Sequence, residues 1–394
     1  MRAFFNRQGG TERNRTLRQV VIRLLAGGSV AVGLMVAAAS SDRLTVALSA
    51  QGCGLRYVAT GDDIPAGHDV SNSERYPDHL YTDHLKKWGL WCEFDIAKNG
   101  TTSPTEISGG QLAQTWNYQP DLITLTIGEQ NTTIVNLVKD CFDKIKDHDF
   151  SGGSVCASTI LGNSSLWSSL NLNLTTILQQ YRLILSGRPR LVVALTGYPN
   201  PYPKSDTAAE KIVELCTPLI DTIPGCTLRW TQLPPALTAI DQVFQKLNTT
   251  IANALSPFAI GSGGRFVFVN TYDKLRDHCM KMEVSIKTHV LHPELMGQEH
   301  DHDSPSAVNF GCDDPWFVAG SDGTASPFSY LMPAVPGVLE QASQTTSGMG
   351  VYPNDAGHKC ISDLIWEADT IDQGVTPLKW KLGIPEAAKS DICT

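Results

Sequence analysis

Four short runs of apolar, largely β-branched residues constrain the fold of this chain most strongly. They lie at residues 56–60, 121–128, 190–199 and 265–270, and segments with helical character separate them. The runs do not alternate between apolar and polar residues, which is typical of parallel strands that are covered by helices on both faces. A further strand is expected within residues 90–100. The sequence therefore predicts an α/β protein that is built on a parallel sheet.

Two of the separating segments carry apolar residues along one helical stripe. These segments are residues 172–185 and 242–255, and we interpret both stripes as core-facing. In an open parallel sheet, ligands bind beyond the carboxyl ends of the strands. The turns at residues 61–67, 99–103 and 128–133 are therefore the places where functional side chains are expected.

The charge distribution separates the start of the chain from the rest. The chain has 31 basic and 40 acidic residues and a net charge of −9, so we expect no nucleic-acid partner. Arginines are concentrated in the first 23 residues, and an apolar run that ends in small residues follows at 24–40. This pattern predicts a signal peptide or signal anchor over residues 1–50. The protein is predicted to be secreted or in the cell envelope, and to contact the membrane only through this segment if it is uncleaved.

The ten cysteines indicate disulfides rather than metal chemistry. The cysteines form no Cys-x-x-Cys pair, which argues against zinc or a thioredoxin-like site, and an even number in an exported chain favours disulfides. No cofactor and no metal site is predicted. Proximity in the sequence suggests the pairs Cys141–Cys156, Cys216–Cys226 and Cys279–Cys312, and the remaining four could pair as Cys53–Cys92 and Cys360–Cys393.

Residues 51–370 are expected to form one domain. Within it, residues 271–346 are rich in Pro, Gly, Asp and His, and lack a long periodic stretch. We expect this region to be an irregular insertion or lid that a disulfide between Cys279 and Cys312 pins. Residues 371–394 are expected to form a C-terminal tail.

The functional turns carry motifs that resemble a known family. "YVATGDDIPAG" (57–67), "NGTTSPTEI" (99–107), "DLITLTIGEQNTT" (121–133) and "VYPNDAGH" (351–358) resemble, in order and spacing, the sequence blocks of SGNH hydrolases, also called GDSL lipases and esterases. The resemblance covers roughly residues 55–366. It implies a three-layer α/β/α, flavodoxin-like fold with a parallel sheet. It also implies ester hydrolysis by a Ser-His-Asp triad, with a Gly N–H and an Asn amide that hold the oxyanion.

Most of the family's catalytic residue types are substituted in this chain. The resemblance places Asp63 at the position of the nucleophilic Ser, and Gln130 at the position of the oxyanion Asn. Tyr352 stands at the position of the general base His. Only Gly100 is retained, and Gln130 still has an amide that can donate. Met349 stands at the position of the orienting Asp, and Asn131 at the Asp that follows the oxyanion Asn.

Two acids beside the Ser position offer a different chemistry. Asp63 and Glu129 are expected to face each other across the crevice, where they could contact a ligand, bind a hard cation or perform acid/base work on a glycoside. Asp62 is expected to lie behind them and is interpreted as a cap of its own turn. His358 is the nearest histidine to the expected crevice, either as a structural residue or as a substitute base.

These residues leave three functions open. The first is a non-catalytic SGNH relative that binds a small-molecule, lipid or glycan ligand in the cell envelope, and this is the interpretation we favour. The second is a working esterase or acyltransferase with non-standard residues, for which Ser103 or Ser108 would supply the hydroxyl and His358 the base. The third is carboxylate chemistry at Asp63 and Glu129.

Overall fold

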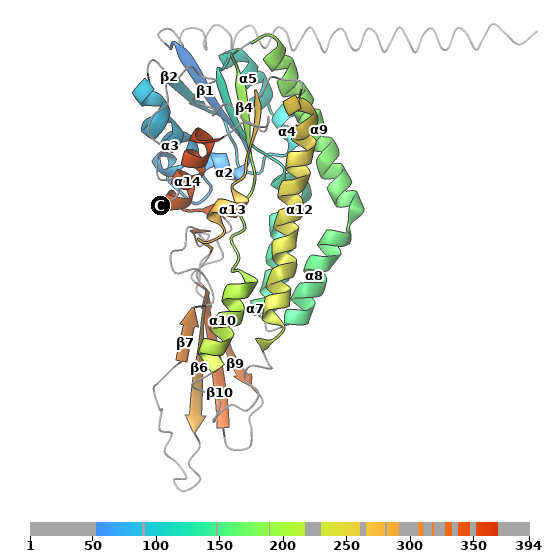
Figure 1. Ribbon diagram of the computed structural model, residues 1–394, viewed down its shortest axis with the longest axis vertical. Coiled ribbons are helices and arrows are strands. Elements are labelled where there is room, and N and C mark those ends of the chain that lie inside the picture. The colour runs from blue at the N-terminus through green and yellow to red at the C-terminus, as the bar shows by residue number, and fades with distance from the viewer. Residues whose placement is uncertain are drawn as a thin grey trace, which may run out of the picture. The chain divides into compact units, whose positions relative to one another are not determined.

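In the computed structural model, five parallel strands form a central sheet (Figure 1). The structure describes residues 53–88, 91–146, 149–188, 190–216, 230–260, 265–279, 282–290, 306–309, 317–318, 328–332, 338–346 and 352–368. The sheet order is β2-β1-β3-β4-β5, which is the flavodoxin-like order. The strands are β1 (Leu55–Gly61), β2 (Trp91–Asp95), β3 (Leu122–Thr126), β4 (Val192–Thr196) and β5 (Phe266–Val269).

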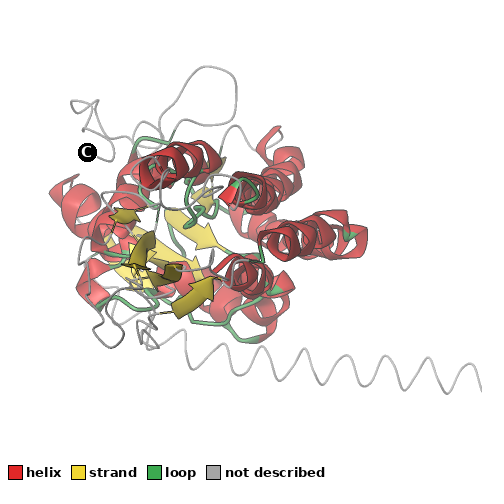
Figure 2. Ribbon diagram, turned by 90° about the horizontal axis from the view of Figure 1, so that it is seen from below, coloured by secondary structure: helices red, strands yellow, loops and turns green. Residues whose placement is uncertain are grey.

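Helices cover both faces of this sheet and complete the three layers (Figures 1 and 2). On one face, the hydroxyl of Tyr76 in α3 lies 3.2 Å from the hydroxyl of Thr126 in β3. On the other face, Thr60 of β1 donates to Glu106 of α4 at 2.6 Å. The predicted α/β/α fold is therefore confirmed. The first face has α3 (Tyr76–His79) and α14 (Asp355–Trp366), and the second has α4 (Ser103–Ser108), α5 (Gln111–Tyr118), α9 (Ser164–Ser186) and α12 (Leu233–Ile260).

The core lies between these layers, and the predicted apolar runs supply its centre. Every residue of β3 and of β4 is buried, as expected for runs without alternation. The stripe predicted within 172–185 faces the interior, where Leu174, Ile177 and Tyr181 are fully buried. The remaining helices are α2 (Asp63–Ala66), η1 (Asn72–Glu74), η2 (Leu80–His84), η3 (Leu85–Trp88), α6 (Glu129–Thr132), α7 (Ile134–Lys146), α8 (Phe150–Gly162), α10 (Ser205–Cys216) and α13 (Tyr272–Leu275).

The region 271–346, which was expected to be irregular, contains a second sheet. This sheet is antiparallel, has four strands and follows the order β7-β6-β10-β9. In β6 the apolar residues Met282, Val284 and Ile286 alternate with polar residues, a period-2 pattern typical of an antiparallel strand. The strands are β6 (Met282–Val290), β7 (Ser306–Asn309), β9 (Phe328–Met332) and β10 (Val338–Thr346), and β8 (Phe317–Val318) pairs separately with β11 (Tyr352–Pro353).

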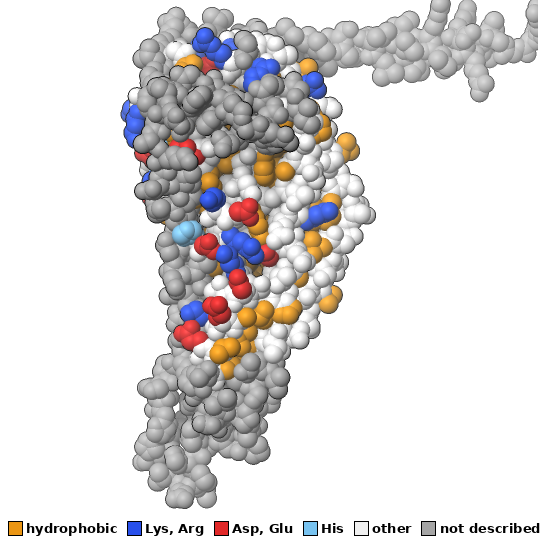
Figure 3. Space-filling view, in the orientation of Figure 1, with side chains coloured by type: hydrophobic (Ala, Val, Ile, Leu, Met, Phe, Trp, Pro, Cys, Tyr) orange, Lys and Arg blue, Asp and Glu red, His pale blue; other side chains and the backbone are white. Residues whose placement is uncertain are grey.

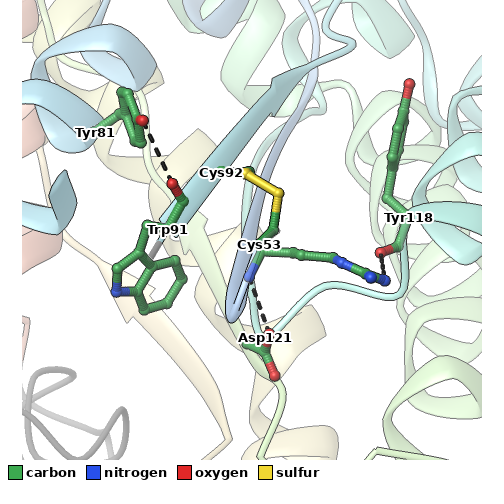
Figure 4. Close-up of a disulfide and its surroundings, with 7 residues drawn as sticks. Cys53, Tyr81, Trp91, Cys92, Tyr118 and Asp121 are labelled. Atoms are coloured by element: carbon green, nitrogen blue, oxygen red, sulfur yellow. Dashed lines mark hydrogen bonds between the residues drawn. A yellow bond between two sulfur atoms is a disulfide. The ribbon is translucent and has the colours of Figure 1, made fainter. Parts of the chain in front are cut away.

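Two predicted disulfides are present among the described residues. Cys53–Cys92 joins the segment just before β1 to β2 (Figure 4), and Cys141–Cys156 joins α7 to α8. Beside the first disulfide, the backbone N–H of Arg56 donates to Asp121 at 3.0 Å. Cys216, Cys279 and Cys360 are also disulfide-bonded. Their predicted partners Cys226, Cys312 and Cys393 lie outside the described residues, so these three pairings stay predictions.

The predicted signal segment, residues 1–50, and the predicted tail, residues 371–394, lie outside the described residues. Within the part of the chain that the structure describes, no helix has the length and apolar character needed to cross a membrane. The described residues all belong to one unit that begins at Cys53.

Candidate functional site

The candidate site lies where β1, β2 and β3 end. Asp62 and Asp63 follow β1, and Asp63 is the first residue of the short helix α2. Gly100 lies in the turn that follows β2, and Glu129 is the first residue of α6 after β3. Because the carboxyl ends of parallel strands meet at one edge of the sheet, these three turns come together there.

The Asp63 carboxylate is the centre of this site. One oxygen, Oδ1, accepts a hydrogen bond from the backbone N–H of Gly100 at 2.5 Å. The other, Oδ2, accepts from the Gln130 side-chain amide and from the Tyr352 hydroxyl, the latter at 3.0 Å. The three donors stand at the positions where the family resemblance puts its Gly, Asn and His. Asp63 is 4% exposed, so its carboxylate depends on these donors rather than on water.

A chain of hydrogen bonds connects Asp63 with the other two acids. The Gln130 amide that donates to Asp63 also lies 3.4 Å from an oxygen of Glu129. The backbone N–H of Glu129 donates to the hydroxyl of Tyr198 at 3.1 Å, and this hydroxyl donates to Asp62. Asp63 and Glu129 were expected to face each other, and their carboxyl groups share the Gln130 amide.

Asp62 lies behind the site and has a structural environment. It is fully buried and is the N-cap of α2, where its side chain accepts from the backbone N–H of Ile64 at 3.4 Å. Its second oxygen accepts from Tyr198. Both oxygens therefore have partners inside the protein, in agreement with a role in the turn itself.

Burial controls the charge of this cluster. Burial raises the pKa of Glu129 well above its usual range, and the neighbouring Asp62 and Asp63 raise it further. Burial likewise raises the pKa of Asp62, although the hydrogen bond from Tyr198 opposes the shift. The pKa of Tyr352 is also raised, because of burial and the nearby acids, so its hydroxyl is a proton donor and not a base at neutral pH.

Replacing Glu129 with Gln is expected to stabilise the protein by about 1 kcal/mol or more near pH 8. Because the pKa of Glu129 is raised in the folded state, the folded protein loses stability as the pH rises above about 4.3, the usual Glu value. The advantage of Glu129→Gln over the wild type should therefore shrink as the pH falls towards that value. Urea unfolding of both proteins across this range measures the effect.

Glu74 provides the matched control for this pH dependence. Its pKa is lowered, mainly because its carboxylate accepts from the backbone N–H of Ser71. A lowered pKa stabilises the folded protein at pH values above the usual Glu pKa, and this stabilisation is lost on acidification. Glu74→Gln should therefore be less stable than the wild type at high pH. If the stability difference from the wild type changed with pH in the same way for both variants, the assignment of a raised pKa to the buried Glu129 would be contradicted.

Ser103 does not have the hydrogen bond to an imidazole that the serine hypothesis requires. Ser103 Oγ donates to the side-chain oxygen of Asn131 at 3.1 Å, and the Ser103 backbone N–H donates to the same oxygen at 2.9 Å. Asn131 therefore links the turn after β2 to α6. No hydrogen bond joins Ser103 to an imidazole among the described residues. Ser108 ends α4 and is exposed.

His358 has a structural environment. It is fully buried in α14, and its Nδ1 accepts from the backbone N–H of Tyr76 at 3.3 Å. Burial lowers the pKa of His358 to about 3, and the positive neighbours His79 and Arg75 contribute. These contacts favour the structural alternative for His358 over the substitute base. Met349, expected at the position of the orienting Asp, lies outside the described residues.

Sequence reasoning missed His68 and Tyr198. The ring of His68 lies 4.5 Å from the ring of Tyr352 in an edge-on contact, and its Nδ1 is 3.2 Å from the side-chain nitrogen of Asn99. The His68 side chain is 41% exposed, so it lies at the mouth of the site. No local motif marks either residue, although the "TGYP" that follows β4 placed Tyr198 at the correct edge of the sheet.

A further buried acid, Glu106, supports the end of β1 that leads into the site. Glu106 is fully buried, and one of its oxygens accepts from Thr60 and from the Tyr181 hydroxyl, each at 2.6 Å. Gln111 joins this network, because its side-chain oxygen accepts from Thr60 and from the backbone N–H of Gly61. Burial raises the pKa of Glu106. The network fixes the end of β1, from which Asp62 and Asp63 project.

The described residues contain no cluster of three or more His, Cys, Asp or Glu side chains arranged to hold a metal ion. A cation between Asp63 and Glu129 would also compete with the three hydrogen bonds that Asp63 already accepts. The arrangement is chemically a filled anion site, in which N–H and O–H donors surround a carboxylate that belongs to the protein.

Comparisons with known proteins find similarity only at the level of solved structures. No family model matches the chain, and no curated protein matches it. An extracellular lipase from Streptomyces rimosus is 17% identical over 57% of this chain and 84% of its own, with a TM-score of 0.38. A family 3 carbohydrate esterase from Clostridium thermocellum is 13% identical over 56% of this chain and 79% of its own, with a TM-score of 0.32. A member of the lipolytic G-D-S-L family from Veillonella parvula is 10% identical over 56% of this chain and 80% of its own, with a TM-score of 0.30.

Proposed function

We propose that this chain is an exported, non-hydrolytic relative of the SGNH hydrolases that binds a ligand at the mouth of a filled catalytic centre. The observation that carries the proposal is the Asp63 carboxylate, which occupies the Gly100 N–H and the Gln130 amide. In an esterase these donors must be free to hold the oxyanion of the substrate. An internal anion therefore competes with the transition state for the same hydrogen bonds.

Among the residues that the structure describes, this centre also lacks a serine nucleophile and a histidine base. A carboxylate at position 63 that attacked an ester would give an anhydride rather than an ordinary acyl-enzyme. Tyr352 is a donor to Asp63 and has a raised pKa, so it does not take a proton at neutral pH. Acid/base work by Asp63 is disfavoured by the same contacts, because both of its oxygens already accept hydrogen bonds.

The mouth of the site supports binding of a neutral, hydroxyl-rich ligand such as a glycan. Asn99 and Gly100 are exposed, and the His68 ring lies beside the Tyr352 ring. An amide, an imidazole and a phenol together offer hydrogen-bonding groups and an aromatic surface, which suit sugar hydroxyls and ring faces.

The first test is ester hydrolysis. The purified chain is expected to give no burst of p-nitrophenol from p-nitrophenyl acetate, and a serine-directed organophosphorus reagent should change nothing. Asp63→Ser should be equally inactive, because Tyr352 is no base. A burst of p-nitrophenol that the reagent abolishes would contradict the proposal that this chain does not hydrolyse esters.

The second test examines the filled anion site directly. Asp63→Gly removes the carboxylate and leaves three donors without an acceptor, so acetate should bind in its place and stabilise the variant. At an acetate concentration ten times the Kd, the gain is about 1.4 kcal/mol. The wild type should not respond, and chloride at the same ionic strength serves as the salt control. An Asp63→Gly variant that is indifferent to acetate would contradict the assigned donors.

The ligand itself is tested by calorimetry with cell-wall glycan fragments. Wild-type protein is expected to bind, and Asn99→Ala and His68→Ala should each weaken binding roughly tenfold, equivalent to about 1.4 kcal/mol. Ser165→Ala, at the exposed start of α9, is the matched control. Absence of glycan binding by the wild type would remove the ligand part of the proposal while leaving the loss of hydrolysis in place.

A further inference from the structure

The surface of α8 and of α9 as far as Tyr181 carries no charged side chain. From Phe150 through Tyr181 the chain contains no Asp, Glu, Lys, Arg or His, although 18% of all its residues are Asp, Glu, Lys or Arg. Protein surfaces are commonly roughly 25–35% charged. In Figure 3 the right-hand edge of the molecule is mostly white with scattered orange, and blue Lys or Arg side chains lie beside it. A stretch of this length is ordinary in a core but not on a surface.

This stretch is only half buried. The inner side of α9 packs against α4 and α12 through Trp167, Leu170, Leu174 and their neighbours along the stripe. The outer side faces solvent and includes two large apolar residues, Leu172 at 66% and Leu183 at 57% exposure. On α8, Val155 is 66% exposed. The other exposed residues of this α8–α9 face are polar or Gly, apart from the single cation Arg182 beside Leu183, and they are Ser151, Ser158, Thr159, Gly162, Asn163, Ser164, Ser165, Ser168, Ser169, Asn171, Thr176, Gln179, Arg182 and Ser186.

We infer that the α8–α9 face is the interface between two copies of this chain. The chain has a net charge of −9, which opposes self-association, so the surface best suited to contact a second copy is one that adds no further repulsion between like charges. A two-fold interface places the same patch against itself, and a charged side chain near the axis would meet its own copy. A face of Ser, Thr, Asn, Gln and scattered Leu and Val avoids this repulsion and can pair its hydroxyls and amides across the axis.

The size of the face also fits a dimer. α8 has 13 residues and α9 has 23, so α9 alone is about 35 Å long at about 1.5 Å per residue. A standard interface needs about 800 Å² per partner and roughly 20–30 residues. The outward halves of these two helices, with the loop ends beside them, approach that size.

A membrane surface is the less suitable occupant. Helices that lie on anionic membranes carry Lys and Arg on the polar side. The α8–α9 face has no cation between Phe150 and Tyr181, and the exposed Arg182 is the first that follows. The chemistry of the face therefore favours a copy of the same chain over a lipid surface.

The test is sedimentation equilibrium of the purified chain across the micromolar range. The wild type is expected to be a dimer, and Leu172→Glu should raise the dimer Kd at least a hundredfold, because two new carboxylates face each other across the axis. Val213→Glu changes an equally exposed apolar residue on α10, 58% exposed, and should leave the Kd unchanged. Circular dichroism should give the same melting temperature for Leu172→Glu and wild type, which separates dissociation from unfolding.

Three outcomes would overturn the inference. The first is a wild type that is monomeric at about 100 µM, well above the roughly micromolar Kd of a weak specific interface. The second is a Leu172→Glu variant that dimerises as the wild type does. The third is a monomer that binds vesicles of phosphatidylcholine and phosphatidylglycerol, with Leu172→Glu abolishing that binding, which would assign the face to lipid.

Discussion

Replacing Gly61 with Ala is expected to lower the free energy of unfolding by about 4 kcal/mol or more. Gly61 ends β1 with a φ of +125°, a conformation that residues with a Cβ rarely adopt. A Cβ at this position would lie 2.0 Å from the backbone oxygen of Thr126. That oxygen accepts the Asp62 N–H at 2.9 Å, so the strand cannot move aside without losing the turn that presents Asp62 and Asp63.

Chemical denaturation of Gly61→Ala against wild type measures this loss. Gly162→Ala is the matched control, because Gly162 ends α8 and a Cβ there meets no atom within 4 Å. The control should be neutral or more stable by up to about 1 kcal/mol, from helix propensity alone. If Gly61→Ala lost no more than the usual scatter of about 0.5 kcal/mol for surface changes, the close approach of β1 and β3 would be refuted.

Removal of the Cys53–Cys92 disulfide is expected to cost about 4 kcal/mol. The two cysteines are 39 residues apart, and closing a loop of that length restricts the unfolded chain by this amount in the chain-entropy model. The disulfide also fastens β1 to β2, the strands whose following turns bring Asp63 to Gly100. The double variant Cys53→Ala/Cys92→Ala should therefore lose stability, and it should lose any glycan affinity at temperatures near its lowered melting point.

The second disulfide supplies the comparison. Cys141–Cys156 closes only 15 residues, so Cys141→Ala/Cys156→Ala should cost about 3 kcal/mol. Urea unfolding of both double variants under non-reducing conditions gives the ranking. A larger loss from the shorter loop would mean that strain or contacts, rather than chain entropy, determine the contribution of these disulfides.

The sheet was predictable because its strands are apolar on both faces. The runs at 121–128 and 190–199 contain β3 and β4 with every strand residue buried, and the runs at 56–60 and 265–270 match β1 and β5. The strands in region 271–346 were not predicted, because turn-forming residues surround them and the period-2 signal in β6 is confined to one short segment.

The site was predictable only as a set of positions. The resemblance placed Asp63, Gly100, Gln130 and Tyr352 together, but the sequence could not say that the first accepts hydrogen bonds from the other three. Asp63 and Tyr352 are 289 residues apart, and Tyr198 and Asp62 are 136 apart. Contacts across such separations depend on how strands and helices pack, and no local pattern encodes them. For His358 the motif left a structural role and a substitute base open, and only the packing shows a buried residue beside Tyr76.

The contacts of Asp63 also make its neighbours mutually dependent. Exchanging Asp63 for Ser alone would leave the Gln130 amide and the Tyr352 hydroxyl without their shared acceptor in a largely buried place, at a cost of about 1–3 kcal/mol for each unpaired group. Introducing His at position 352 alone would place a basic side chain beside the Asp63 carboxylate but would supply no nucleophile. Single substitutions in either direction are therefore disfavoured, and these positions are expected to change together within any lineage. A search for active relatives of this chain should accordingly look for coordinated triplets at positions 63, 130 and 352 rather than for a serine alone.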